Sequence, residues 1–121
     1  LDHFSAINST HGESNGDRVL KEVGRIFRSA MRINDLVARI GPDSFAMLLP
    51  ETPFAGAQIV AGKLHKALNS TKIRSGNRSI QVNGSFGIAS SSRNTSKPGD
   101  LLKVAEKALK QAQKRGGNQV A

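Results

Sequence analysis

Residues able to support catalysis gather between two short apolar segments, 36–40 and 45–49. The intervening segment 41–44 reads Gly-Pro-Asp-Ser. Asp43 carries a carboxylate and Ser44 a hydroxyl, both side chains of types that can take part in chemistry. Two apolar runs joined by turn residues predict a β-hairpin. The tip of this hairpin is therefore the first candidate site.

A second pair of residues with recognisable chemistry lies just upstream. Arg32 and Asp35 have the spacing R-x-x-D, and five residues separate Asp35 from Gly41. An arginine offers a planar fork of N–H donors, and an aspartate offers a carboxylate acceptor. The alternative is that Arg32 only complements the end of the preceding helix while Asp35 makes a turn.

The apolar periodicity predicts three helices that would position these residues. The first opens with Asp17 as N-cap and ends near Arg32. The second begins with Thr52 as N-cap and Pro53 as first helical residue. The third spans 100–115 and buries Leu102 among others.

Between the helices, 74–79 is expected to be a turn, followed by an irregular strand over 80–88, and 118–121 an edge strand. Helices between mostly antiparallel strands predict an α+β fold with one sheet covered by helices.

Composition limits the remaining possibilities. The chain of 121 residues is long enough for one domain, and it contains no cysteine, which excludes disulfides and thiolate chemistry. No apolar run has the length of a membrane span, so membrane insertion by this segment is not expected. The absence of cysteine is compatible with a reducing compartment, and a cytoplasmic location is expected. The net charge of +9 suits either an anionic partner or a solvated basic surface.

Other residues of suggestive type have simpler interpretations. The histidines are not arranged as metal ligands and are expected on the surface: His3, His11 and His65. A basic stripe on the third helix lacks the interleaved aromatic side chains on which bases stack. It is expected to be a solvated face, with no nucleic acid as partner; its members are Lys103, Lys107, Lys110 and Lys114.

Five segments, in order, read LDHFSAIN, HGESNGDRVL, RINDLVARIGPDSF, VNGSFGIA and AEKALKQAQKRGGN. Together they resemble the GGDEF family, the diguanylate cyclase domains of bacterial cyclic di-GMP signalling. The resemblance covers essentially the whole chain, so 1–121 is expected to be a single degenerate GGDEF domain. It implies a ferredoxin-like βαββαβ core, related to nucleotide cyclases and polymerase palms. The chain is expected to be a piece of a longer protein, with its first strand truncated at the N-terminus.

Active members of the family bring two GTP-loaded domains face to face, and each 3′-hydroxyl attacks the α-phosphate of the other GTP. Metal ions held by carboxylates stabilise the developing charge. The resemblance aligns the signature motif with Gly41, Pro42, Asp43, Ser44 and Phe45. Proline stands in place of the second glycine, where it fixes φ and removes an N–H, and serine replaces the glutamate. Asp43 matches the metal-binding acid and Phe45 a core position, and cyclase activity is expected to be lost.

The resemblance also implies a relic guanine-nucleotide site at Asn8, Asp17 and Gly41. Asp2 matches the second acid of the family's D-x-D run, and the metal-binding first acid would lie upstream of Leu1.

Two phosphate-holding cations of the family fall at Gln113 and Gly117, where neither residue is charged. Each charge-assisted contact is worth about 1.5–3 kcal/mol, so GTP binding is expected to be weak or lost. Lys114 or Arg115 could partly substitute.

Arg32 and Asp35 match the family's inhibitory site for cyclic di-GMP, with Lys63 a candidate for a further basic contact. The expected function is a catalytically inactive regulatory module. Two alternatives stay open: an active cyclase with a variant motif, and a nucleotide-free dimerisation domain. No cofactor is expected, with Mg²⁺ relevant only if nucleotide binding at the hairpin persists. Expected partners are cyclic di-GMP, flanking sensor or EAL phosphodiesterase domains, and a second copy in a homodimer.

Overall fold

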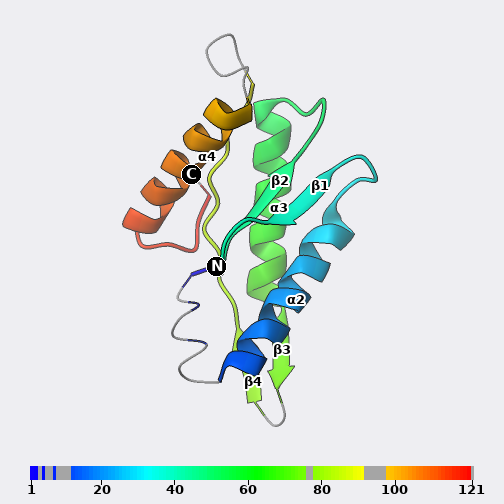
Figure 1. The fold of residues 1–121 in the computed structure, drawn as a ribbon, viewed down its shortest axis with the longest axis vertical. Coiled ribbons are helices and arrows are strands. Elements are labelled where there is room, and N and C mark those ends of the chain that lie inside the picture. The colour runs from blue at the N-terminus through cyan, green and yellow to red at the C-terminus, as the bar shows by residue number, and fades with distance from the viewer. Residues whose placement is uncertain (3, 5–6, 8–11, 76–77, 92–97, 121) are drawn as a thin grey trace.

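The computed structural model describes residues 1–2, 4, 7, 12–75, 78–91 and 98–120. Helices and antiparallel strands follow one another within these ranges, which confirms the α+β class (Figure 1). None of the described helices is both long enough and apolar enough to span a membrane. The elements are α2 (Glu13–Ala30), β1 (Leu36–Arg39), β2 (Phe45–Leu48), α3 (Phe54–Ser70), β3 (Lys72–Ser75), β4 (Arg78–Gln81) and α4 (Pro98–Lys114).

The first described helix, α2, starts earlier than its sequence predicts. It begins at Glu13, after Gly12 in a left-handed conformation with φ of 86°, which glycine adopts at little cost. The backbone N–H of Gly16 already donates to the carbonyl of Gly12 at 3.0 Å. The prediction that Asp17 is the N-cap is therefore wrong, because a full helical turn precedes it.

The hairpin of β1 and β2 is confirmed: both strands begin where predicted, and each ends one residue earlier. Its register pairs Val37 with Met47 and Arg39 with Phe45. Val37, Met47 and Phe45 pack on the core, and the ring of Phe45 lies edge-on to that of Phe27 in α2 at 5.4 Å between centroids. This aromatic contact anchors the base of the hairpin tip to α2.

A second hairpin, β3 and β4, replaces much of the turn predicted over 74–79. Its strands pair antiparallel, with Ile73 opposite Ile80, and both isoleucines are buried. β-Branched side chains on the inward face favour a strand. Here this preference exceeds the turn preference of the polar residues that follow. The predicted extent of the turn was wrong, and residues 76–77 lie outside the described ranges.

The strands form two separate two-stranded sheets within the described residues, β1–β2 and β3–β4, rather than the single sheet expected. Segment 84–91 contributes an isolated parallel bridge between Phe86 and Val120. The edge expected over 118–121 is thus limited to this bridge, and Ala121 lies outside the described residues.

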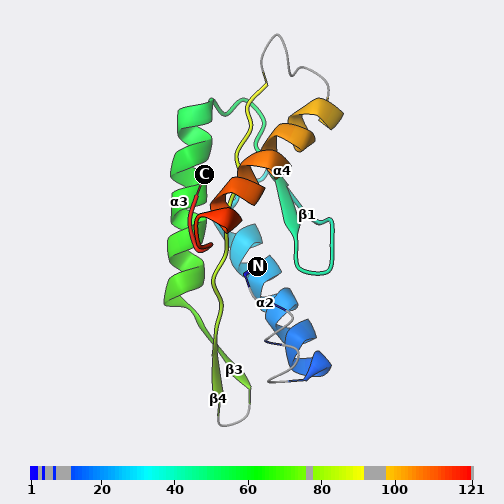
Figure 2. The same ribbon diagram turned by 90° about the vertical axis from the view of Figure 1, so that its left-hand side faces the viewer.

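The core lies between α2, α3, the strands and segment 82–86. Helix α4 crosses segment 84–91 on the side away from α2, as Figure 2 shows. Leu102 in α4 stays 43% exposed, so the prediction that it is buried was wrong. The buried apolar residues are Phe4, Val19, Leu20, Val23, Ile26, Phe27, Ala61, Leu64, Leu68, Ile73, Ile80, Val82, Phe86 and Ala112.

The contact between α4 and segment 84–91 depends on a glycine. A Cβ atom on Gly87 would lie 2.2 Å from the carbonyl oxygen of Ala105 and 2.3 Å from the backbone nitrogen of Leu109. Both atoms belong to the backbone of α4, which cannot move aside as a flexible side chain can. Only glycine permits the helix to approach this closely.

Candidate functional site

The hairpin tip is closed by its own backbone and by Arg39. The N–H of Ile40 donates to the carbonyl of Ser44 at 2.9 Å. Arg39 donates from Nε to the carbonyl of Gly41 at 2.9 Å and from Nη2 to that of Pro42 at 2.8 Å. The arginine therefore satisfies two carbonyl oxygens of the tip. Its role was not apparent from the sequence, because it depends on how the turn folds back.

Asp43 is half buried at the tip, and its Oδ1 accepts from the hydroxyl of Ser44 at 3.4 Å. Across the described ranges, no group of three or more histidine, cysteine, aspartate or glutamate residues is arranged to hold a metal ion. The metal-binding role of Asp43 stays a prediction. Phe45 packs against the core as expected.

Replacing Arg39 with methionine is expected to loosen the tip without unfolding the domain. Methionine keeps the apolar stem but cannot donate to the carbonyls of Gly41 and Pro42. Two hydrogen bonds at an exposed position are lost, so the free energy of unfolding should fall by about 1 kcal/mol or less. Hydrogen exchange should accelerate in 40–45 while α3 is unaffected. Acceleration throughout the domain would contradict this local role.

The structure brings Arg32 and Asp35 together just beyond the end of α2. The Asp35 side chain is buried, and its Oδ2 accepts from the backbone N–H of Arg32 at 2.8 Å and from its Nε at 3.4 Å. The Arg32 side chain is 65% exposed. A turn is also present, since the N–H of Asp35 donates to the carbonyl of Arg32 at 3.0 Å. The pair thus combines a fixed carboxylate with an accessible guanidinium.

The second carboxylate oxygen of Asp35 differs from the first in its hydrogen bonding. Its Oδ1 is buried and has no hydrogen-bond partner within the described part of the chain. Arg28 approaches from α2, but it donates to the backbone carbonyl of Asp35, at 2.7 Å, and not to the carboxylate. A buried acceptor without a donor is uncommon in proteins. The site therefore has a hydrogen-bond acceptor that none of the described residues uses.

The guanidinium of Arg32 also reaches the segment between β2 and α3. Its Nη2 donates to the hydroxyl of Thr52 and lies 3.5 Å from the carbonyl of Pro50. The Thr52 hydroxyl in turn donates to Pro50 at 3.2 Å, and the intervening Glu51 is left-handed with φ of 56°. Thr52 was predicted as the N-cap of α3, but Pro53 holds that position. Its hydroxyl contacts Arg32 instead, which the sequence pattern did not indicate.

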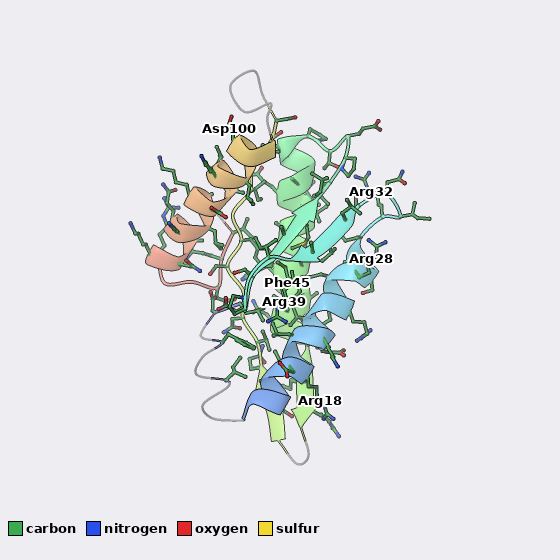
Figure 3. All side chains as sticks on the ribbon, in the orientation of Figure 1. Arg18, Arg28, Arg32, Arg39, Phe45 and Asp100 are labelled. Atoms are coloured by element: carbon green, nitrogen blue, oxygen red, sulfur yellow. The ribbon has the colours of Figure 1, made fainter. Side chains whose placement is uncertain are left out.

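Figure 3 separates the two candidate regions. Arg28 and Arg32 lie together near the C-terminal end of α2, whereas Arg39 and Phe45 lie toward the hairpin tip, near the middle of the molecule.

The other predicted site residues are distributed as follows. Asn8, His3 and His11 lie outside the described residues. Asp17 is exposed on α2, and Lys63 is exposed on α3; their predicted ligand contacts remain untested. The stripe formed by Lys103, Lys107, Lys110 and Lys114 is exposed, as expected for a solvated face.

His65 is half exposed at the surface, where its ring makes contacts that the sequence did not indicate. Its Nε2 lies 2.8 Å from the carbonyl oxygen of Asn118. Its imidazole ring packs edge-on to the ring of Phe86. It links α3 to the C-terminal segment.

The predicted phosphate-holding position Gly117 faces a carboxylate. Gly117 is left-handed with φ of 73°, and a Cβ there would lie 3.1 Å from the Asp2 carboxylate. The next N–H, of Asn118, donates to Asp2 Oδ2 at 2.6 Å, and the Ser85 hydroxyl donates to Oδ1 at 2.7 Å. Gln113 is exposed on α4. Asp2 therefore provides a negative charge where phosphate recognition was expected to need positive charge.

Comparisons with known proteins find a matching family model and similar sequences. The family model described as "Diguanylate cyclase, GGDEF domain" matches residues 1–119. The chain is 36% identical over 121 residues to the uncharacterized protein YhcK of Bacillus subtilis. This match covers 99% of this chain and 34% of that protein. It is 32% identical over 120 residues to diguanylate cyclase A of Treponema denticola, covering 99% and 32%.

The solved structures agree with the sequence comparisons. The GGDEF domain of YfiN from Pseudomonas aeruginosa superposes with a TM-score of 0.93 at 30% identity, covering 98% of this chain and 74% of that one. The chain spans about a third of the length of the two curated relatives above. Because the family model matches nearly every residue and the fold agrees, this chain belongs to the GGDEF domain family.

Proposed function

We propose that this domain is a regulatory receptor of cyclic di-GMP signalling that binds cyclic di-GMP at Arg32 and Asp35 and does not synthesise it. The observation that carries the proposal is the geometry of this pair. A buried, oriented carboxylate lies beside an arginine whose side chain is 65% exposed. Guanine can be recognised by a planar donor fork at O6 and N7 and by a carboxylate that accepts from N1–H and N2–H.

The unused hydrogen-bonding groups of the site match the edges of guanine. Asp35 Oδ1 is buried and without a partner in the described part of the chain. A ligand that displaces the groups covering it would supply donors from guanine N1–H and N2–H. The guanidinium of Arg32 carries five N–H groups, of which contacts to Asp35 and Thr52 use only some.

The residues of the hairpin tip support the proposal that this domain does not synthesise cyclic di-GMP. Pro42 offers no N–H at the position that the resemblance assigns to a glycine, and the serine hydroxyl of Ser44 replaces a carboxylate. Arg39 binds the carbonyls of Gly41 and Pro42, which stabilises the closed tip.

Calorimetry with cyclic di-GMP on the full-length protein tests the proposal. Arg32→Ala should weaken binding by about 10-fold to 100-fold, because a charge-assisted contact is worth about 1.5–3 kcal/mol. Arg25→Ala is the matched control, since Arg25 is an exposed arginine of α2 that also pairs with an acid three residues away. It should bind like the unmodified protein. Absence of heat at high ligand concentration would defeat the receptor role and favour a nucleotide-free dimerisation domain.

An active cyclase is the second candidate, favoured by the Treponema relative that is named a diguanylate cyclase and by the retained Asp43. Incubation of the full-length protein with GTP and either Mg²⁺ or Mn²⁺ distinguishes the two. We expect no cyclic di-GMP to form. Clear product formation would show that Pro42 and Ser44 are tolerated.

The larger assembly follows from the receptor role. The domain would act in the cytoplasm within a multidomain protein, coupled to a sensor domain, an EAL domain or a second copy. Ligand binding at Arg32 and Asp35 would then be passed to those neighbours.

A further inference from the structure

Arg28, in the last turn of α2, is a cation without an acidic partner in the described part of the chain. The arginines on either side of it are each paired with an acid, Arg25 with Glu22 and Arg32 with Asp35. Arg28 is exposed, and it forms no salt bridge with any described residue. The region beside the Arg32–Asp35 pair therefore carries one positive charge that no described acid balances.

The two arginines of this region use different edges of the guanidinium for their hydrogen bonds. Arg32 is engaged through Nε, by Asp35, and through Nη2, by Thr52. Arg28 is engaged through Nη1, which donates to the backbone carbonyl of Asp35 at 2.7 Å. The Nε and Nη2 groups of Arg28 form no hydrogen bond with any described residue. Such a planar pair of N–H donors is the fork that binds an anion with two parallel hydrogen bonds.

The bond from Arg28 to Asp35 fixes where this fork lies. Both guanidinium groups bond to oxygens of Asp35, that of Arg28 to the backbone carbonyl and that of Arg32 to Oδ2. Figure 3 shows the two arginines together at the C-terminal end of α2. A ligand held by Arg32 and Asp35 would therefore lie beside a second arginine whose fork is unoccupied by the described residues.

We propose that Arg28 is a further binding residue of this site, and that it recognises a phosphate group attached to the guanine of the ligand. This inference rests on the proposed function, because it places a guanine at Arg32 and Asp35. Guanine is uncharged, so contacts to the base alone leave the charge of Arg28 unbalanced, whereas a phosphodiester supplies a negative charge that matches the fork. The site would therefore select guanine nucleotides over guanosine.

A purely structural role for Arg28 leads to a different expectation. A cation in the last turn of a helix interacts favourably with the C-terminal end of the helix dipole, and Arg28 is the basic residue in the last turn of α2. In that role Arg28 would stabilise the helix end and the turn at Asp35. Its loss would then weaken every ligand of the site equally, with or without a phosphate.

Calorimetry on the full-length protein, with cyclic di-GMP and with guanosine, separates these two roles. Arg28→Met keeps the apolar stem but removes the fork, so cyclic di-GMP should bind about 10-fold or more weakly. Guanosine should bind as to the unmodified protein. Because one ion pair with the ligand is lost, the affinity for cyclic di-GMP should also depend less steeply on salt concentration.

Lys21→Met is the matched control, since Lys21 is an exposed cation of α2 that forms no salt bridge with any described residue. It removes the same charge from the same helix and should bind both ligands like the unmodified protein. Arg28→Lys keeps the charge and a donor for the carbonyl of Asp35 but lacks the fork. It should retain the salt dependence and bind cyclic di-GMP about 3-fold or more weakly.

The outcomes separate this inference from the receptor role. Equal losses for cyclic di-GMP and guanosine in Arg28→Met, or unchanged binding of cyclic di-GMP, would overturn the inference while Arg32→Ala still shows the receptor role. If guanosine binds too weakly to measure, an unchanged salt dependence in Arg28→Met overturns it. If Arg28→Met does not fold, full affinity in Arg28→Lys overturns it. Absence of cyclic di-GMP binding to the unmodified protein would overturn the receptor role and this inference together.

Discussion

Replacing Gly87 with alanine is expected to lower the free energy of unfolding by about 3 kcal/mol or more. The added Cβ would meet the backbone of α4 at 2.2 Å, on the carbonyl oxygen of Ala105. Helix α4 must then move away from segment 84–91 as a unit. For a domain of this size the midpoint of thermal unfolding should fall by about 10 °C.

Gly62→Ala is the control for this change. Gly62 lies within α3, where an added Cβ meets nothing within 4 Å. Alanine should stabilise the helix there by about 0.5–1 kcal/mol, because it restricts the unfolded chain and favours helix. Thermal or denaturant unfolding of both variants measures the contrast. Equal stabilities for Gly87→Ala and the unmodified protein would mean that α4 packs less closely than the structure shows.

Asp35→Ala is expected to abolish detectable binding of cyclic di-GMP and to destabilise the domain by about 1–3 kcal/mol. The stability loss arises because the backbone N–H of Arg32 loses its 2.8 Å acceptor in a partly buried turn. Binding is lost because guanine loses the carboxylate that accepts from it. Denaturant unfolding and calorimetry on the same preparation measure the two effects.

Asp35→Asn separates folding from recognition. An asparagine oxygen can still accept from the Arg32 backbone, so the free energy of unfolding should recover most of the loss. The amide lacks the negative charge that strengthens hydrogen bonds to guanine, so affinity should remain at least 10-fold lower. Unchanged affinity in Asp35→Asn would place the ligand elsewhere, whatever the stability of the variant.

The local patterns of the sequence predicted the hairpin well, whereas the ligand role of Arg32 and Asp35 stays a prediction. Apolar residues flanking Gly41-Pro42 specify the hairpin within one residue at each end, because turn chemistry and strand pattern act locally. Arg32 and Asp35 are close because only three positions separate them.

Features set by distant contacts were missed. Asp17 resembled an N-cap, but the helix continues back to Gly12, since one residue type does not determine where a helix begins. The partner of Arg32 at Thr52 lies 20 residues away and depends on how β2 leads into α3. The hairpin of β3 and β4 forms because Ile73 and Ile80 are buried together, which the polar residues between them concealed.

In the proposed receptor, the bond between Arg32 and Thr52 would make ligand binding a competition within the protein. A ligand that binds Arg32 Nη2 would have to displace the Thr52 hydroxyl. The apparent affinity would then be the intrinsic affinity multiplied by the fraction of molecules in which the Arg32–Thr52 bond is open. The same event would release 50–52, just before α3. Occupancy at the end of α2 would then give freedom to a loop 20 residues further along the chain, and a neighbouring domain that contacts this loop would sense the ligand without touching it.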